Sequence, residues 1–128
     1  MVNISSAIVG LTVTGMSAYA VSKASIDQLT RIVAKEVVLY GVRINGLYPG
    51  MVATSIQDLS LDFGLDQMAE EYRQIFLRAR AAGLLRPPEE PARAICWLAG
   101  PWSEPLTGKI VDIDTPWFRE KVKADIPT

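Results

Sequence analysis

Two side chains in the stretch Ser17-Ala-Tyr-Ala-Val-Ser-Lys23 have the types and the spacing needed for acid–base chemistry. Tyr19 and Lys23 are four positions apart, so on a helix they stand one above the other on the same face. A neighbouring ammonium favours phenolate over phenol and lowers the pKa of a tyrosine from its reference near ~10. A phenol tuned in this way can act as a general acid or base. The same pair also occurs in ordinary surface helices, so by itself it is a hypothesis.

Two predicted strands end close to this pair in residues that could face a ligand. The first strand is the apolar run 1–4, read as the tail of a buried strand, and it ends in two hydroxyls of which Ser6 is the second. The second strand is residues 42–48, stopped by Pro49-Gly50, because proline cannot extend a central ladder and glycine lets the chain reverse. Ligands bind at the carboxyl ends of parallel strands. We therefore expect these segments to meet the Tyr19 helix at one edge of a sheet.

The helix that carries the pair is predicted to run from an N-cap at Ser17 to a stop at Gly41. Its apolar residues recur at helical spacing. They are Val21, Ala24, Leu29, Ile32, Val33 and Val37.

Two further helices and a strand complete the predicted order of elements. Residues 66–82 and a segment opened by Pro88 and ended by Gly100-Pro101 have helical patterns, and Lys109–Ile113 has that of a strand. The order strand, helix, strand, helix, helix, strand predicts an α/β fold. We expect the second half of a doubly wound, Rossmann-like parallel sheet with flanking helices.

Composition excludes several classes of function. With 13 basic and 14 acidic residues and a net charge of -1, the chain has no field to attract nucleic acid or an anionic membrane. The absence of His removes the usual Ser-His, Cys-His and zinc-His sites, and no metal site is expected. At 128 residues the chain is short for a complete dinucleotide-binding oxidoreductase. These features favour small-molecule partners and a half-domain.

The single cysteine and the uncharged N-terminal stretch bear on the compartment. Cys96 cannot form an internal disulfide, and its apolar neighbours predict a small buried side chain. Residues 1–22 carry no charge, but they lack the basic flank of a signal peptide and the continuous apolar run of a membrane span. A reducing, cytoplasmic setting is the expectation.

The ordered motifs resemble the short-chain dehydrogenase/reductase family. A strand ending in Ser6 is followed thirteen residues later by Tyr19-x-x-x-Lys23, and then by Pro-Gly-x-Val-x-Thr at residues 49–54. The resemblance continues through Pro88-Glu-Glu90, Trp97-Leu-Ala and Thr107-Gly108 to Asp114. Two departures stand out. The glycine-rich dinucleotide loop and the catalytic Asn of the family's first half are missing, and the family's closing Asp-Gly-Gly is replaced by Asp114-Thr-Pro116.

The resemblance implies a role for each motif residue. Tyr19 would protonate a carbonyl oxygen as hydride arrives from a nicotinamide, and would act as base in the reverse direction. Lys23 would lower the pKa of Tyr19 and hydrogen-bond the nicotinamide ribose, while Ser6 would hold the substrate oxygen. Val52 would offer its backbone to the carboxamide.

Four further residues receive smaller roles. Thr54 would lie near the carboxamide, beside the Pro49-Gly50 turn that shapes the cofactor site. Ser5 is the alternative to Ser6, but the thirteen-residue spacing selects Ser6. Ser22 is expected to be supportive, and Asn45 to tie its strand.

The resemblance also implies cofactor, substrate and assembly. It implies NAD or NADP in a full-length parent, a small carbonyl or alcohol substrate, and a homo-oligomer formed through the 17–40 helix. Residues 1–128 would be the C-terminal catalytic half of one domain, with 55–86 as the substrate lid. The alternative is a truncated, cofactor-free fragment, or an interaction partner that docks through the long helix. Without a phosphate-binding glycine loop we expect little affinity for dinucleotides.

Overall fold

A computed structural model describes residues 1–55 and 70–126, and a three-stranded parallel sheet lies at its centre. The strands are β1 (Val2–Ile4), β2 (Asn45–Tyr48) and β3 (Ile110–Asp112), and they lie side by side in that order. All pairings are parallel, so the carboxyl ends of the three strands share one edge. This confirms the predicted α/β class with a parallel sheet.

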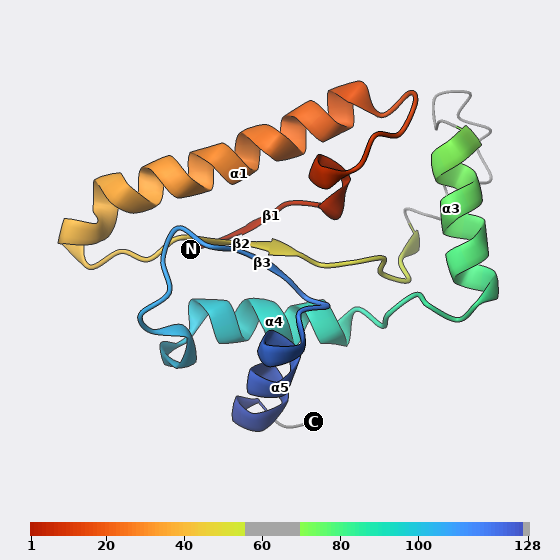
Figure 1. The fold of residues 1–128 in the computed structure, drawn as a ribbon. Coiled ribbons are helices and arrows are strands. Elements are labelled where there is room, and N and C mark those ends of the chain that lie inside the picture. The colour runs from red at the N-terminus through yellow and green to blue at the C-terminus, as the bar shows by residue number, and fades with distance from the viewer. Residues whose placement is uncertain (56–69, 127–128) are drawn as a thin grey trace.

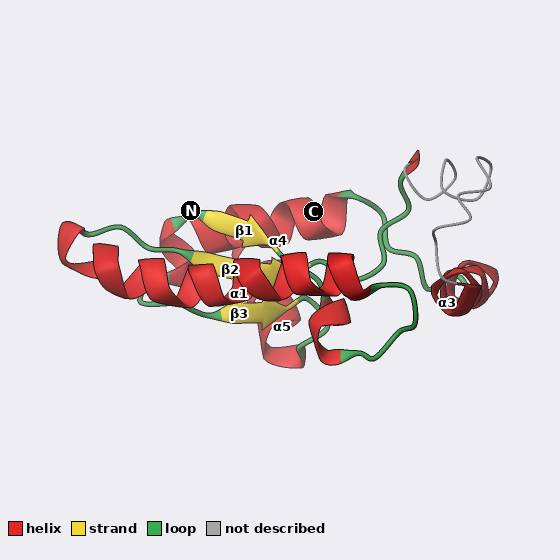
Figure 2. Cartoon of the chain, turned by 90° about the horizontal axis from the view of Figure 1, so that it is seen from above, coloured by secondary structure: helices red, strands yellow, loops and turns green. Residues whose placement is uncertain are grey.

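Helices cover both faces of the sheet (Figure 1). One face carries α1, and the other carries α4 and α5, while α3 stands beyond the carboxyl ends of the strands (Figures 1 and 2). The α-helices are α1 (Ser17–Val37), α3 (Glu70–Ala81), α4 (Glu89–Ala99) and α5 (Pro116–Asp125). Short 3₁₀ helices are η1 (Ala7–Gly10), η2 (Val38–Tyr40) and η3 (Pro101–Ser103).

The two connections between neighbouring strands have opposite hands. α1 joins β1 to β2, and α4 joins β2 to β3, so both connections move in the same direction across the sheet. The two helices nevertheless lie on opposite faces (Figure 1). Parallel crossovers are nearly always right-handed, so one of these two is an exception. As a result, this three-stranded sheet has helices on both of its faces (Figure 1).

The apolar core lies between the sheet and the α4/α5 layer. Phe118 is fully buried, and its ring meets that of Trp97 edge-to-face at 5.4 Å between centroids. The indole Nε1 of Trp97 donates to Asp125 Oδ2 at 2.7 Å, which ties α5 to α4. The core residues are Leu47, Ala94, Trp97, Leu98, Val111, Ile113, Phe118 and Val122. The tail after Asp114 therefore folds as a helix that completes the core, which the sequence analysis did not anticipate.

The contact between α1 and the sheet is polar. Asp27 and Thr30 are buried there, beside the small Ala34. The apolar side chains of Val21 and Leu29 instead face solvent, with 65% and 56% of their surface exposed. Of the predicted apolar positions, Val33 and Val37 are half-buried, but apolar spacing missed Asp27 and Thr30, whose burial is stabilised by hydrogen bonds.

Several predicted boundaries shift by one to three residues. The helix begins at Ser17 but its N-cap position is Met16, so Ser17 does not cap it. Its 3₁₀ extension ends at Gly41, whose φ of 71° is left-handed, as a C-terminal glycine predicts. Pro88 is the N-cap of α4 and not its first helical residue.

Two burial predictions were wrong. Ile4 is 39% exposed, because β1 is the edge strand of this sheet and has a neighbour on one side only. Cys96 is exposed, because α4 turns Ala94, Trp97 and Leu98 toward the core and leaves Cys96 on its outer side. The predicted 66–82 helix is described as α3 from Glu70, and its first part lies outside the described residues.

Candidate active site

The predicted site residues from β1, β2 and α1 lie at the carboxyl edge of the sheet. Ser5 N donates to Leu47 O at 2.9 Å, so the chain leaves β1 and β2 at the same level. Lys23 Nζ donates to Ile4 O at 3.0 Å, which holds the first turns of α1 over the end of β1. Figure 1 shows the start of α1 and the ends of the strands at the same end of the molecule.

Tyr19 and Lys23 form the pair expected from their spacing. The Lys23 ammonium lies 5.7 Å from the centroid of the Tyr19 ring. Tyr19 is 40% exposed, so its phenol is open to a ligand. An ammonium has three N–H donors, and Ile4 O takes one, which leaves two for hydroxyl groups of a bound molecule.

The two hydroxyls after β1 have different surroundings. Ser5 is 2% exposed, and its Oγ donates to Lys23 O at 3.2 Å, so it fastens α1 to β1. Ser6 is half-buried, and its Oγ accepts from Ile8 N at 3.2 Å as the cap of η1. A hydroxyl that accepts from the backbone keeps its own proton to donate. Of the two hydroxyls, Ser6 thus keeps its O–H donor available, whereas Ser5 already donates to Lys23 O.

Ser22 and Asn45 have structural contacts. Ser22 Oγ donates to Tyr19 O at 2.7 Å within the helix. Asn45 is buried; its Nδ2 donates to Leu106 O at 2.9 Å and its Oδ1 accepts from Lys109 N at 3.1 Å. Asn45 ties β2 to the chain entering β3, as expected from the sequence.

The turn after β2 is fixed by an arginine that sequence reasoning missed. The φ of Gly50 is +70°, and a Cβ there would lie 2.7 Å from Arg86 Nε. Arg86 holds Asp114 Oδ1 at 2.7 Å and Glu90 Oε2 at 3.3 Å, and its backbone pairs with Val52 in an isolated parallel bridge. No local pattern predicts this contact, because it joins segments that are distant in the sequence. Of the other predicted cofactor residues, Pro49 is half-buried and Thr54 is exposed.

Helix α3 reaches this edge from the side. Glu71 Oε2 accepts from Thr14 N at 3.1 Å, in the segment just before α1. Burial raises the pKa of the Tyr72 phenol, and the nearby Tyr19 raises it further. α3 therefore lies next to the start of α1, inside the range 55–86 that was predicted to cover substrate; residues 56–69 of that range are outside the described part.

Asp27 was also missed, although it continues the column of Tyr19 and Lys23 by one more turn. Its Oδ2 accepts from the Tyr48 hydroxyl at 2.5 Å. Burial, and then the hydrogen bond to this carboxylate, raise the pKa of Tyr48 to about 12. Tyr48 thus stays a hydrogen-bond donor at neutral pH. The spacing of four residues between Lys23 and Asp27 was the available signal.

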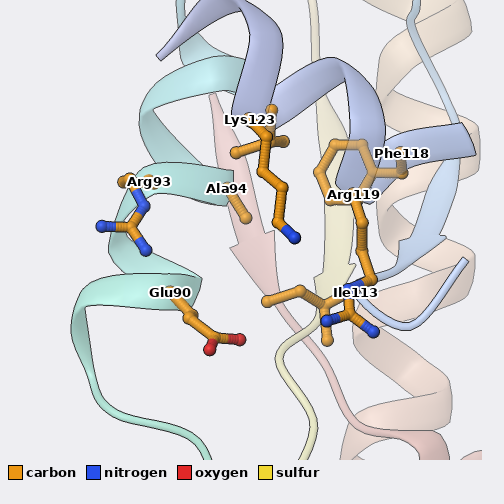
Figure 3. Close-up of a pocket in the computed structure, with 8 residues that line it drawn as sticks. Glu90, Arg93, Ala94, Ile113, Phe118, Arg119 and Lys123 are labelled. Carbon is orange, nitrogen blue, oxygen red and sulfur yellow. The ribbon is translucent and has the colours of Figure 1, made fainter. Parts of the chain in front are cut away.

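A separate cavity lies on the opposite face of the sheet. It has a volume of about 110 Å³, between α4 and α5. Its lining combines an apolar floor that includes Ile113 and Phe118 with charged residues such as Glu90 and Lys123 (Figure 3). It contains neither Tyr19 nor Lys23, so we do not assign it to the active site.

Membrane-spanning helices and metal-binding clusters are absent from the described part of the chain. Within residues 1–55 and 70–126, no helix combines the length and apolarity needed to cross a bilayer. The same described part of the chain holds no group of three His, Cys, Asp or Glu residues placed to bind a metal ion.

Comparison with known proteins identifies the family. A family model described as enoyl-(acyl carrier protein) reductase matches residues 1–115. The chain belongs to the short-chain dehydrogenase/reductase family. This family of oxidoreductases was the one indicated by the Tyr19 and Lys23 motif.

Short-chain dehydrogenase/reductase relatives are found in fungi and bacteria. The chain is 34% identical over 116 residues to the short chain dehydrogenase/reductase astE of Aspergillus oryzae, covering 90% of this chain and 42% of that protein. It is 31% identical over 114 residues to the 3-oxoacyl-[acyl-carrier-protein] reductase FabG of Thermotoga maritima, covering 89% and 43%. The chain thus spans less than half the length of these curated relatives.

Solved structures agree with the fold. An NADPH-bound short chain oxidoreductase from Pseudomonas aeruginosa PAO1, containing an atypical catalytic center, matches with a TM-score of 0.65 and 31% identity. That match covers 87% of this chain and 42% of the other. A short chain dehydrogenase/reductase from Saccharomyces cerevisiae matches with a TM-score of 0.77 at 21% identity, over 93% and 47% of the two chains.

Proposed function

We propose that the protein carrying this sequence is an NAD(P)-dependent oxidoreductase that transfers hydride between a nicotinamide and a small carbonyl or alcohol substrate. Residues 1–128 would form the C-terminal catalytic half of its domain. The observation that carries the proposal is the exposed Tyr19 phenol, with the Lys23 ammonium 5.7 Å from its ring at the carboxyl edge of the sheet. A cytoplasmic setting is part of the proposal.

The proposed roles follow from the hydrogen-bond donors and acceptors that each side chain still has available. In reduction, Tyr19 gives its proton to the carbonyl oxygen, and in oxidation it takes the proton back. Lys23, held by Ile4 O, directs its remaining N–H groups to ribose hydroxyls. Ser6 donates to the substrate oxygen. The bound nicotinamide supplies or accepts the hydride.

The cofactor side is assigned to the turn after β2. Gly50 lies against the Arg86 side chain with a left-handed φ of +70°, a backbone conformation that favours glycine. Pro49 and Gly50 would line the cofactor, Val52 would present its backbone to the carboxamide, and Thr54 would lie beside it. The NADPH-bound relative from Pseudomonas aeruginosa supports a nicotinamide cofactor. Residues 55–86, which include α3, are proposed as the substrate lid.

The proposed partner is a second copy of the chain, bound through the 17–40 helix. Val21, Leu29 and Ile32 are exposed on α1. Leu39 and Tyr40, which follow in η2, are 92% and 81% exposed. Exposed apolar surface of this kind is typical of an interaction site.

The proposal is tested by substitution of Tyr19 in the protein carrying this sequence. Tyr19→Phe should lower kcat by at least about a hundredfold while cofactor affinity is kept, because only the transferable proton is lost. Lys23→Ala should lower both kcat and cofactor affinity, because the same ammonium lies beside Tyr19 and is proposed to bind the ribose. Tyr40→Phe is the matched control: it removes the hydroxyl of an 81% exposed tyrosine outside the Tyr19–Lys23 pair and keeps the apolar ring, so kcat should not change. An active Tyr19→Phe enzyme would end the assignment.

A second candidate is a cofactor-free interaction chain, favoured by the exposed apolar residues of α1 and η2. The 128-residue chain alone should then self-associate and show no saturable change of NADH or NADPH fluorescence. A stable monomer that binds either cofactor tightly would contradict both this candidate and the half-domain assignment. A longer protein that reduces a carbonyl would favour the enzyme.

A further inference from the structure

A hydrogen bond between α1 and β2 connects the two sides of the proposed site. Asp27 lies two turns beyond Tyr19 on the same face of α1, and its carboxylate accepts from the Tyr48 hydroxyl at 2.5 Å. Tyr48 is the last residue of β2, directly before the Pro49-Gly50 turn. One contact thus joins the helix of the acid–base pair to the strand that leads into the cofactor turn.

No other side-chain hydrogen bond joins α1 to β2 among the residues the structure describes. The remaining side-chain bonds between α1 and the sheet all go to β1 or the residue that follows it. Thr30 Oγ1 accepts from Asn3 Nδ2 at 2.8 Å, and the bonds of Lys23 and Ser5 link the end of β1 to the helix. Asp27 thus supplies the one side-chain hydrogen bond from α1 to β2 in the described part of the chain.

Burial of the Asp27 carboxylate costs free energy, which reduces its net contribution to stability. Asp27 is 2% exposed, and its Oδ1 has no hydrogen-bond partner in the described structure. A buried charge with incomplete hydrogen bonding costs free energy, and an apolar side chain of similar size is often as stable or more stable at such a position. Apolar packing, however, does not fix the rotation and height of a helix as a directional hydrogen bond does.

We propose that Asp27 is a positioning residue that, through Tyr48, sets Tyr19 and Lys23 against the Pro49-Gly50 turn. This proposal rests on the proposed function of that pair. Without the bond, the side-chain bonds that remain between α1 and the sheet reach only β1 and Ser5 within the described residues, so no bond from α1 to β2 sets the distance between the Tyr19–Lys23 pair and the turn. A displacement of about 1 Å at a catalytic group can cost on the order of a hundredfold in rate.

The test compares three variants in the protein carrying this sequence. Asp27→Leu combined with Tyr48→Phe replaces the polar pair by an apolar one, so the unfolding midpoint should stay at or above wild type while kcat falls at least about tenfold. Asp27→Asn keeps an acceptor oxygen for Tyr48 and should retain kcat within about threefold. Glu120→Gln, at an exposed position of α5 away from the proposed site and from the 17–40 helix, is the control and should change neither quantity.

The outcomes separate this proposal from the proposed function. A stable double variant with full activity overturns the positioning role and leaves the assignment of Tyr19 intact. If kcat of the double variant falls only because its unfolding midpoint has fallen, the positioning role is overturned as well. If the wild-type protein has no reductase activity, crystal structures of wild type and double variant decide, because an α1 that keeps its place on β2 refutes the proposal independently of catalysis.

Discussion

The two faces of the sheet are covered by helices that are held in different ways. Against α4 and α5 lies an apolar core in which Leu47 and Phe118 are completely buried. Against α1 the buried side chains include Asp27 and Thr30, and the contacts are hydrogen bonds to Tyr48 and Asn3. One face is packed, and the other is hydrogen-bonded.

The two faces contribute differently to the stability of the fold and to its geometry. Burial of apolar area is non-directional and supplies most of the free energy of folding. Hydrogen bonds add less net free energy, but they fix distances and angles. The proposed catalytic side chains of Tyr19 and Lys23 come from the hydrogen-bonded face, so the fold separates the part that stabilises from the part that positions.

The packed face should give the largest loss of stability. Phe118→Ala should lower the free energy of unfolding by about 3–5 kcal/mol, because it leaves a cavity under α4 and α5. Denaturant unfolding measures the change. Trp117→Ala is the neighbouring control and should cost clearly less, since 47% of that side chain is already exposed. Equal losses at the two positions would mean that α5 does not complete the core.

Substitutions on the hydrogen-bonded face should lower the free energy of unfolding less than those in the apolar core. Thr30→Val keeps the shape of the side chain but removes the acceptor of Asn3 and the donor to Ile26 O. We expect a loss of about 1–2 kcal/mol in the same unfolding experiment. Ser25→Ala, whose Oγ bonds only within the exposed side of α1, should have almost no effect. A loss at Thr30 as large as that at Phe118 would remove the contrast between the faces.

The contrast also explains which parts of the molecule could be predicted from the sequence. Local rules sufficed for the order of the main helices and strands up to β3, for the column of Tyr19 and Lys23, and for the helix stop at Gly41, because spacing and backbone conformation act within a few residues. The family followed from the order of those motifs. The packed face was partly visible too, since α4 shows the apolar pattern of a core helix.

The hydrogen-bonded face could not be predicted in the same way. Apolar spacing on α1 pointed to Val21 and Leu29, which face solvent, while the buried carboxylate of Asp27 finds its partner Tyr48 at 21 residues' distance. Arg86, which shapes the Gly50 turn, is likewise a tertiary contact. Spacing places Asp27 in one column with Lys23, but it does not tell whether a polar side chain is buried against a partner or solvated, so these contacts become visible only in the folded chain.

The last expected effect is a pH dependence confined to the hydrogen-bonded face. The pKa of Tyr48 is about 12 in the folded protein against a reference of 10.0, so the folded state binds this proton more tightly than the unfolded chain. The corresponding stabilisation is complete below about pH 10 and is lost as the pH rises from 10 to 12. Wild-type unfolding midpoints in urea should therefore fall more steeply over this range than those of Tyr48→Phe.

The raised pKa of Tyr72 acts in the same direction but is common to both proteins, so it cancels in the difference. The core residues of the packed face carry no ionisable side chain, and Phe118→Ala should leave the slope unchanged. Parallel pH profiles for wild type and Tyr48→Phe would show that the buried contact with Asp27 does not form.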